Sequence, residues 1–526
     1  MKRRDFLRYG IPTAAAVPAV INGISVKAMG MESPLIRALM GYATDTDHVL
    51  VLVQLNGGND GLNTVIPLEF YSAYTNARSN VAIPENKVLR LQNFNKAGLH
   101  PSMTGIQQLY SEGKIAIVQS VGYPDPNFSH FRATDIWMSG SDSNQYLKSG
   151  WAGRYLDNQY PGFPQGYPNN AVPDPLGIQV GSLTSFTFQG PQVSMGMSIS
   201  DPVNFYNLIN GIEDPVPNTN AGNELKYIRT IAKQTQQYSE VVKAAALRVA
   251  QQKSYPSNNP LADQLKIVAR LIAGGLKTRI YMVNIAGFDT HSTQVNPSDT
   301  TTGIHANLLG NLSSAIKAFM DDLKFLGVHR RVLGMTFSEF GRRIKSNSST
   351  GTDHGAAAPL ILFGEYVEAG VHGSNPVIPA NATVNDNIPF QYDFRSVYAS
   401  VLEKWFCLDN ASLQMVLLKN YQSLGLVKTN SCNSAIPDLS DKVLIKNYPN
   451  PFSSSTTITF LTNGGHTSVI IIDVMGRVIK TLIDQEYNDA GQYTVTFESD
   501  TLPSGVYYVR LQNGPVQQVR PMLKVR

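Results

Sequence analysis

Val49-Leu50-Val51-Leu52-Val53 is an unbroken apolar run, and it leads into a polar, glycine-rich segment, Asn56-Gly57-Gly58-Asn59-Asp60-Gly61. An unbroken run, rather than an alternating one, is typical of a strand that is covered on both faces. Three further runs of this kind follow, at residues 115–118, 280–285 and 332–337. The sequence therefore predicts a buried, mainly parallel sheet with a polar segment at the carboxyl end of each strand.

Helical periodicity separates these runs. Between the third and the fourth, apolar side chains recur at three- and four-residue steps, at Ile304, Leu308, Leu312, Ile316, Phe319 and Leu323. A shorter helix with Ile106 and Leu109 precedes the second run and ends near Gly113. This strand–helix–strand order predicts a doubly wound α/β fold. The less regular segment 144–257, with a helix around 225–252, is interpreted as an insertion or cap on the sheet.

The end of the chain has the pattern of a separate all-β module, beginning at about residue 446. Short strands are expected at 456–460, 469–472, 493–497 and 506–511. Gly, Asn, Asp and Pro turn signals separate them at tight spacing, as in a small β-sandwich. A polar, aperiodic stretch, 428–445, is expected to link this module to a core that spans 47–427.

Residues 1–30 are interpreted as an export signal and not as part of the fold. A basic start is followed by a short run that is too weakly apolar to anchor in a membrane. Arg3-Arg4-Asp5-Phe6-Leu7-Arg8 resembles the twin-arginine motif, whose route carries folded proteins; an ordinary secretory signal is the alternative. No later segment has the roughly 20 apolar residues that span a bilayer, so no transmembrane segment is expected in the mature protein.

Composition disfavours two classes of function. With 43 basic and 39 acidic residues the net charge is +4, and no basic stripe suggests nucleic acid as a partner. The only cysteines, Cys407 and Cys432, are too few for a zinc ribbon or a four-cysteine iron–sulfur site. In an oxidising compartment they can form a disulfide or remain thiols, because their spacing does not decide the geometry.

Acidic, imidazole and hydroxyl side chains gather in the segments that follow the apolar runs. In chain order they are Asp60, Ser129, His130, Asp289, His291, Glu339, Arg342, Asp353 and His354. Because ligands of open α/β sheets bind beyond the carboxyl ends of the strands, we expect these side chains to meet at one edge.

Several carboxylates at one point repel one another unless cations offset their charge. Imidazole with carboxylate suits zinc or manganese, and carboxylate alone suits magnesium or calcium. We therefore expect one or two divalent metal ions, although the site is also compatible with none. The candidate ligands are Asp60, Asp289, His291, Glu339, Asp353 and His354.

Each residue also has a structural alternative. Asp60 suits a turn with Asx hydrogen bonds, and Ser129 suits a helix N-cap. Asp289 can cap the next helix, and Glu339 can form an ion pair with a nearby arginine. The prediction of a site depends on convergence at one edge and not on any single residue.

Five segments of the core, in this order, resemble the family catalogued as "domain of unknown function 1501". They are Leu55 to Asn63, Leu99-His100-Pro101, Ser129-His130-Phe131, Ser338-Glu339-Phe340-Gly341-Arg342 and Gly351-Thr352-Asp353-His354-Gly355. The resemblance covers essentially the whole core and implies an alkaline-phosphatase-like fold, from the superfamily that includes sulfatases. It implies a metal site but no particular substrate.

The superfamily pattern assigns roles to individual positions. It implies that Ser129 stands where the nucleophile lies, and that Asp60 is a metal ligand. Asp289 and His291 match the pair that holds one metal. Phe340 stands where the superfamily has a histidine, so the sequence departs from the pattern at the second metal.

Three ordered motifs in the last eighty or so residues resemble the C-terminal sorting domain of the type IX secretion system. They are Asn447-Tyr448-Pro449-Asn450-Pro451-Phe452, Asp473-Val474-Met475-Gly476-Arg477-Val478 and Leu502-Pro503-Ser504-Gly505-Val506-Tyr507-Tyr508. The resemblance implies an immunoglobulin-like sandwich over 446–526, export through the periplasm, and release or attachment at the cell surface. It also implies a Bacteroidetes-type source and partnership with that machinery, after the twin-arginine or general export machinery. A generic carbohydrate- or protein-binding sandwich is the alternative.

Together these patterns predict an exported, metal-dependent hydrolase of phosphate or sulfate esters, acting on a small anionic ester or glycan. Ser129 would attack, with His130 beside it, and Arg342 or Arg343 would bind substrate oxygens. The alternative is a non-catalytic binding or assembly protein on a degenerate hydrolase fold, suggested by Phe340. The absence of a G-x-S-x-G elbow disfavours a serine esterase.

Overall fold

The computed structural model describes residues 47–200, 238–428 and 445–525, with short gaps in the last range at 463–464, 475, 488–490, 500–501 and 514–515. Before residue 47 it describes only strands β1 (Ala19–Ile21) and β2 (Ile24–Val26), which pair antiparallel. Most of the predicted export signal 1–30 and of the linker 428–445 lies outside these residues. No helix in the described part is long and apolar enough to cross a membrane.

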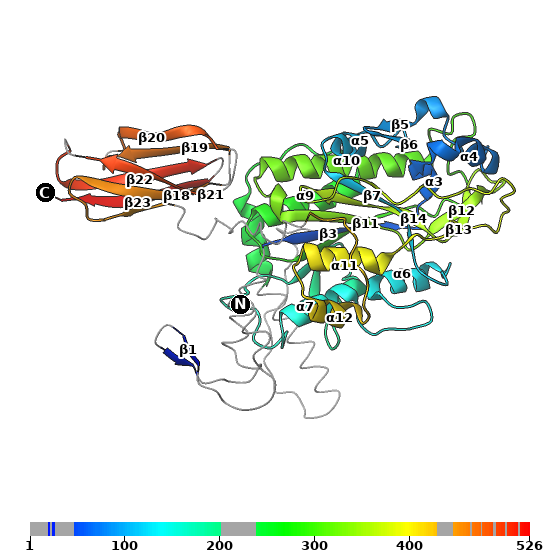
Figure 1. Ribbon diagram of the computed structural model, residues 1–526, viewed down its shortest axis with the longest axis horizontal. Coiled ribbons are helices and arrows are strands. Elements are labelled where there is room, and N and C mark those ends of the chain that lie inside the picture. Colours follow the sequence, from blue (N-terminus) through cyan, green and yellow to red (C-terminus); the bar gives the residue numbers. More distant parts are fainter. Residues whose placement is uncertain are drawn as a thin grey trace. The chain divides into compact units, whose positions relative to one another are not determined.

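The core contains a nine-stranded sheet, in the order β15-β7-β14-β11-β3-β10-β8-β9, with β16 also paired to β7 (Figure 1). The strands are β3 Val49–Asn56, β7 Ile115–Gly122, β8 Gly177–Val180, β9 Gly196–Ile199, β10 Ile280–Ala286, β11 Val332–Phe337, β14 Ala358–Gly364, β15 Gly370–His372 and β16 Tyr392–Asp393. The four predicted apolar runs are β3, β7, β10 and β11. Central β3 pairs parallel with both β10 and β11.

One strand departs from the parallel arrangement. Beyond β11 the chain forms a hairpin of β12 (Gly341–Ser346) and β13 (Thr352–Gly355), then re-enters the sheet as β14, antiparallel to β11 and β7. After a short hairpin the chain is still at the same edge of the sheet, so the next strand must run antiparallel. A parallel strand would need a long crossover to the opposite edge. The predicted mainly parallel α/β fold is confirmed.

Helices cover both faces of the sheet, which explains the unbroken apolar run in β3. Val49, Val51 and Val53 face one helical layer, and Leu50 and Leu52 face the other, each with at most 1% of its surface exposed. The first layer contains α5 (Thr104–Ser111), α9 (Pro260–Ala273) and α10 (Ile304–Phe325). The second contains α6 (His130–Ser139), α7 (Trp151–Gln159), α11 (Phe394–Lys404) and α12 (Asn410–Leu417). Full burial of such a side chain contributes about 1.5–3 kcal/mol.

The interpretation of 144–257 as an insertion or cap is wrong for its described part. This segment supplies β8, which pairs parallel with β10, and β9, which pairs parallel with β8. It also supplies α7, whose Trp151 and Tyr155 are buried in the second core. Both strands are only four residues long and so give a weak periodic signal. Of the helix expected around 225–252, residues 238–252 are described; 238–248 are helical and 249–252 are not.

The C-terminal module is all-β, as predicted. A three-stranded sheet has the order β17-β18-β21, and a four-stranded sheet has the order β20-β19-β22-β23. The strands are β17 Ile445–Tyr448, β18 Ser455–Thr462, β19 Gly465–Ile472, β20 Val478–Tyr487, β21 Gly491–Glu498, β22 Gly505–Asn513 and β23 Val516–Lys524. Side chains from both sheets, including Phe460, Ile471 and Leu511, share one apolar core. The four predicted strands are β18, β19, β21 and β22.

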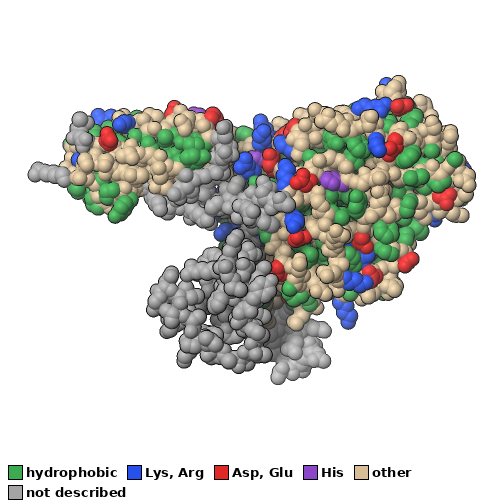
Figure 2. Space-filling view, viewed as in Figure 1, with side chains coloured by type: hydrophobic (Ala, Val, Ile, Leu, Met, Phe, Trp, Pro, Cys, Tyr) green, Lys and Arg blue, Asp and Glu red, His purple; other side chains and the backbone are tan. Residues whose placement is uncertain are grey.

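Cys407 is disulfide-bonded, and the only other cysteine of the chain, Cys432, lies outside the described residues. Basic and acidic side chains are interspersed on the face shown in Figure 2.

His48 is a buried neutral histidine at the start of β3. Its ring stacks on Trp405 with 3.8 Å between centroids, and Nδ1 donates to the Trp405 carbonyl at 2.7 Å. Burial, reinforced by the charges of Arg279 and Arg331, lowers the pKa of His48 from 6.5 to about 4.

This shift predicts acid sensitivity. Between pH 6.5 and about 4 the unfolded chain binds a proton at this position that the folded chain does not, so stability is complete above pH 6.5 and falls as the pH falls towards 4. At about 1.4 kcal/mol per pKa unit, the loss is roughly 3 kcal/mol. Thermal melts across this pH range are expected to show a shallower pH dependence for His48→Gln than for the parent. His372→Gln, at a half-buried histidine in β15, should retain the parent's slope; equal slopes for His48→Gln and the parent would contradict the assignment.

Candidate metal centre

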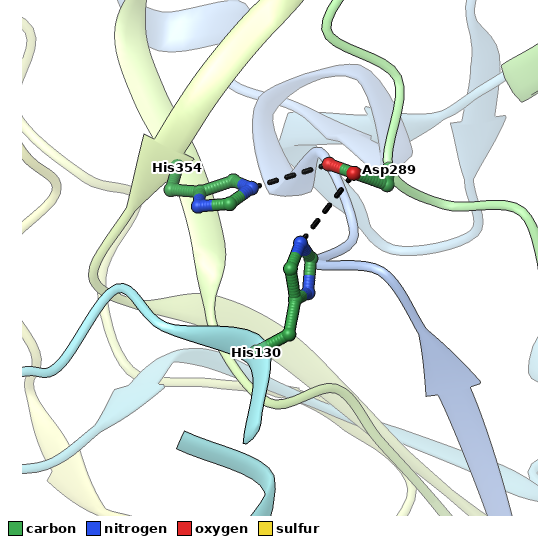
Figure 3. A group of neighbouring side chains, drawn as sticks. All are labelled: His130, Asp289 and His354. Carbon is green, nitrogen blue, oxygen red and sulfur yellow. Dashed lines mark hydrogen bonds and ion pairs between the residues drawn. The ribbon is translucent and has the colours of Figure 1, made fainter. Parts of the chain in front are cut away.

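Loops from three strands bring His130, Asp289 and His354 together at the carboxyl edge of the sheet. His130 begins α6 after β7, Asp289 follows β10, and His354 lies in β13 after β11. In Figure 3 both imidazoles point at the Asp289 carboxylate. His130 Nε2 lies 3.4 Å from Asp289 Oδ2, and His354 Nε2 lies 3.2 Å from Oδ1. One ligand atom from each of the three residues lies within 4.8 Å of the other two, the spacing of a potential metal site.

A third imidazole, that of His291, reaches the same carboxylate. Its Nε2 lies 3.3 Å from Asp289 Oδ1 and 2.9 Å from His354 Nε2. We call His130, His291, His354 and Asp289 the three-histidine group.

The outer nitrogen of each imidazole has a partner that can only accept a hydrogen bond. His130 Nδ1 lies 2.9 Å from Glu339 Oε1, and His291 Nδ1 lies 3.0 Å from Asp353 Oδ1. His354 Nδ1 lies 2.9 Å from the Phe128 carbonyl. Carboxylate and carbonyl oxygens carry no hydrogen, so each neutral ring must donate from Nδ1 and present a bare Nε2 lone pair inward.

Three lone pairs and a carboxylate that face one another repel unless a cation or a proton lies among them. In particular, two bare Nε2 atoms 2.9 Å apart cannot hydrogen-bond to each other. An imidazole whose Nδ1–H is held by a carboxylate or carbonyl is the usual arrangement around a protein-bound metal. The donor set therefore fits a divalent ion that accepts imidazole, such as zinc or manganese.

The glycine-rich loop after β3 packs directly against this group. Gly57 has φ of 122°, and a β-carbon there would lie 2.3 Å from the backbone nitrogen of Asp289. At Gly58, with φ of 83°, a β-carbon would lie 2.3 Å from the ring of Phe340. Gly57 also donates its N–H to Glu339 Oε1 at 2.8 Å. Only glycine permits both the backbone conformation and the approach.

Arg342 fixes Asp289 from behind. Its buried guanidinium donates to Asp289 Oδ1 at 2.8 Å and to the backbone carbonyls of four residues, Gly57, Gly58, Phe288 and Thr352. Only 1% of Arg342 is exposed, so it positions the carboxylate and is not available to substrate.

The electrostatics keep these groups in metal-binding forms. Burial raises the pKa of Asp289, but the hydrogen bond from Arg342 and the arginine charge outweigh it and hold the pKa at about 2. Burial and the Arg342 charge lower the pKa of His354 although its Nε2 lies beside the Asp289 carboxylate. At neutral pH the carboxylate is therefore ionised and His354 is neutral.

Asp60 lies apart from the three-histidine group. It is 1% exposed, and both carboxylate oxygens accept from Arg78 Nη1, at 2.8 and 2.7 Å. Gln294 Nε2 donates to Oδ2 at 2.6 Å. Although burial raises the pKa of Asp60, the Arg78 charge outweighs it and lowers the pKa. Among the described residues, an arginine thus supplies the positive charge that was expected from a metal.

Ser129 lies at the rim of the group. It is exposed at the N-cap position of α6, but its hydroxyl makes no cap bond. Its neighbours on either side both contact the group, Phe128 through its carbonyl and His130 through its ring. The structure thus places the Ser129 hydroxyl one residue from a candidate ligand.

Among the residues singled out from the sequence, the structure brings together His130, Asp289, His291 and His354, with Glu339 and Asp353 behind two of the rings. Sequence reasoning missed the Phe128 carbonyl, and also Asn347, which donates to Asp353 Oδ1 at 3.0 Å and to the His291 carbonyl at 2.8 Å. A backbone carbonyl has no sequence signal, and Asn347 lies in a polar turn like many others.

Comparison with protein families identifies the core. The family described as "Protein of unknown function (DUF1501)" matches residues 47–410. The chain belongs to this family. The DUF1501 core is followed at residues 446–524 by a match to "Secretion system C-terminal sorting domain". The predicted destination, secreted or at the cell surface, is confirmed.

No curated protein matches this DUF1501 chain. Among solved structures it is similar to a Bacteroides thetaiotaomicron protein described with the metabolism of multiple glycosaminoglycans, at 11% identity and TM-score 0.32, covering 83% of this chain and 89% of that one. It is also similar to a Pseudoalteromonas sulfatase, at 9% identity and TM-score 0.31, covering 88% and 85%. A Silicibacter pomeroyi phosphonate monoester hydrolase has 9% identity and TM-score 0.32, covering 90% and 88%. Likeness at these TM-scores says nothing about what the DUF1501 core does.

Proposed function

We propose that the chain binds one divalent cation, zinc or manganese, at the three-histidine group and hydrolyses phosphate or sulfate esters there. The observation that carries the proposal is the inward orientation of three Nε2 atoms around Asp289, each enforced by an acceptor at Nδ1. A bound ion would polarise the oxygens of the transferred group and offset the charge that develops on them.

One ion is proposed, and not two, because arginines already neutralise two of the carboxylates that were expected to bind metal. Arg78 pairs with Asp60, and Arg342 pairs with Asp289. Phe340 fills the place beside the group where the superfamily pattern has a further histidine, with its ring 4.4 Å from that of His354 and 4.9 Å from that of His130. Magnesium and calcium are disfavoured because they prefer oxygen ligands over imidazole.

The chain's own residues supply the nucleophile and the anion contacts. In the proposed reaction, the Ser129 oxygen bonds to phosphorus or sulfur, and the ester oxygen leaves as the alcohol with the serine proton. Water then releases phosphate or sulfate and restores the hydroxyl. The N–H groups in the first turn of α6 and the half-exposed Arg343 would bind the negative oxygens.

The test combines metal analysis with one substitution. The purified full-length chain should contain about one zinc or manganese ion and hydrolyse 4-nitrophenyl phosphate or sulfate, and Ser129→Ala should reduce kcat by roughly a thousandfold or more. Ser111→Ala, an exposed serine on α5, is the matched control. A metal-free protein, or a Ser129→Ala variant with full activity, would overturn the proposal.

Glu339→Gln tests the support behind His130. The amide oxygen can still accept from Nδ1, but the negative charge that makes the ring a better ligand is lost. We expect metal affinity to fall by roughly 10–100-fold, measured by calorimetric titration of the metal-depleted chain. Glu112→Gln, at a surface pair with Lys114, should bind like the parent. Equal affinities for the two variants would contradict the role of Glu339.

A second candidate is a non-catalytic binding protein, favoured by the packing of Phe340 against His130 and His354. In that case the chain would bind its ion but leave both ester classes intact at every pH tested. Metal content and turnover therefore separate the two functions.

We also infer the route and the organisation of the chain from sequence. The twin-arginine motif at Arg3-Arg4 and the Bacteroidetes-type sorting motifs support export of a protein that folds before it leaves the cytoplasm. The proposed parts are signal 1–30, core 47–427, linker 428–445 and sorting domain 446–526. Replacing both arginines by lysine should block export.

A further inference from the structure

We propose that the chain carries a second ligand site, a saccharide-binding cleft at the end of α6 that is remote from the three-histidine group. A cavity of about 410 Å³ lies between the C-terminal ends of α6 and α12. Its lining includes Ser141, Asp142, Gln145, Tyr146, Lys419 and Tyr421. His130 is at the other end of α6, and ten residues at 1.5 Å each separate the two sites by about 15 Å.

Tyr146 provides an exposed aromatic face that is held in place. The Arg132 guanidinium lies 3.9 Å from the centroid of its ring, yet 80% of Tyr146 is exposed, so the opposite face is open. Arg132 is itself 8% exposed and donates to the carbonyls of Asp142, Ser143 and Gln145. The loop and the ring are therefore fixed before any ligand arrives, which reduces the entropy cost of binding.

The charges in the cleft are already paired. Asp142 accepts from Arg395 and from Lys419, and Arg395 also lies 4.8 Å from the ring of Tyr421. An anionic ligand would meet a carboxylate, and a cationic ligand would have to displace Lys419 or Arg395. The cleft therefore fits a neutral ligand.

Polar side chains that a ligand can reach lie beside the ring. Gln145 is exposed, and the Lys419 side chain is 54% exposed although it pairs with Asp142. Both line the cavity, so the cleft offers hydrogen-bonding groups next to an aromatic face.

A sugar ring matches these features together. Its C–H face is apolar and packs on an aromatic face, whereas its rim of hydroxyls bonds to side chains such as Gln145 and Lys419. The volume lies within the range of small-ligand pockets, about 300–1,000 Å³. The ligand class that fits is therefore a neutral saccharide, and an exported protein encounters saccharides outside the cell.

Native electrophoresis of the full-length chain through gels with and without starch, mannan, barley β-glucan or galactan tests the cleft. We expect retardation by at least one polysaccharide and roughly tenfold weaker binding of that polysaccharide by Tyr146→Ala. Tyr146→Trp should restore binding. Phe131→Ala, which removes an aromatic side chain that is 91% exposed at the other end of α6, should bind like the parent.

Three results would overturn the proposal: no retardation by any of the four polysaccharides, equal retardation of the parent and Tyr146→Ala, or loss of binding in Phe131→Ala alone. Binding should persist after chelation of the metal, so the cleft can fail or succeed independently of the proposed hydrolase. Because Tyr146 is exposed, its substitution is not expected to unfold the chain.

Discussion

Replacing Asp289 by asparagine is expected to lower the affinity of the chain for zinc or manganese by a hundredfold or more and to abolish ester hydrolysis. Even outer-shell substitutions typically cost about 10–100-fold in metal affinity, and Asp289 is the carboxylate on which all three inner nitrogens converge. The substitution removes the negative charge that offsets Arg342 while it keeps the shape of the side chain. A divalent ion would then face the buried arginine without a compensating anion.

Calorimetric titration and elemental analysis of the purified variant measure this effect. Asp299→Asn is the matched control, because Asp299 is an exposed aspartate that accepts hydrogen bonds within its own turn, from Thr301. It should retain the parent's metal content and activity. If Asp289→Asn binds metal as tightly as the parent, the three-histidine group is not the metal centre.

The sequence predicted which loops meet, because that depends on topology. The unbroken apolar run of β3 required cover on both faces, and parallel strands place their following loops at one edge. That argument alone brought His130, Asp289, His291 and His354 to one place. It did not require any knowledge of side-chain conformation.

The division of roles within the site could not be predicted, because it depends on which way each side chain turns. Glu339 and Asp353 were expected as ligands, yet both bind the outer nitrogens of histidines. His130 was expected to act in catalysis, yet its Nε2 faces Asp289. Spacing along the chain is the same for a carboxylate that meets a metal and for one that orients a ring, so the roles of these residues remain predictions that metal titration can decide.

The strand direction of β14 and the place of β8 were also beyond the sequence. The direction of β14 depends on the short β12–β13 hairpin that precedes it, and β8 has only four residues and so carries little periodic signal. The strands of the sorting domain were easier to predict, because apolar and polar residues alternate along them and turn residues separate them at short intervals. Its three missed strands, β17, β20 and β23, lie at the ends of the order in which their sheets pair.

Arg78→Met is expected to destabilise the core by about 3–5 kcal/mol. Asp60 is 1% exposed and ionised, and without Arg78 its buried charge would lose its cationic partner and retain the hydrogen bond from Gln294. The midpoint of the core's thermal transition should fall by several degrees. Arg90→Ala is the control. Arg90 and Glu85 form an ion pair in which each side chain is 53% exposed, and such pairs contribute about 0–1 kcal/mol to the free energy of unfolding.

The double variant Asp60→Asn with Arg78→Met separates charge neutralisation from packing. If Arg78 serves to neutralise Asp60, removing both charges should recover most of the lost stability, because no bare ion remains in the core. Recovery should be incomplete, since Arg78 also donates to the carbonyls of Arg343 and Ile344. The same double variant should still bind one metal ion, because Asp60 accepts from an arginine and not from the three-histidine group. A double variant that regained stability but lost its metal would instead place Asp60 in the metal centre and restore the case for a second ion.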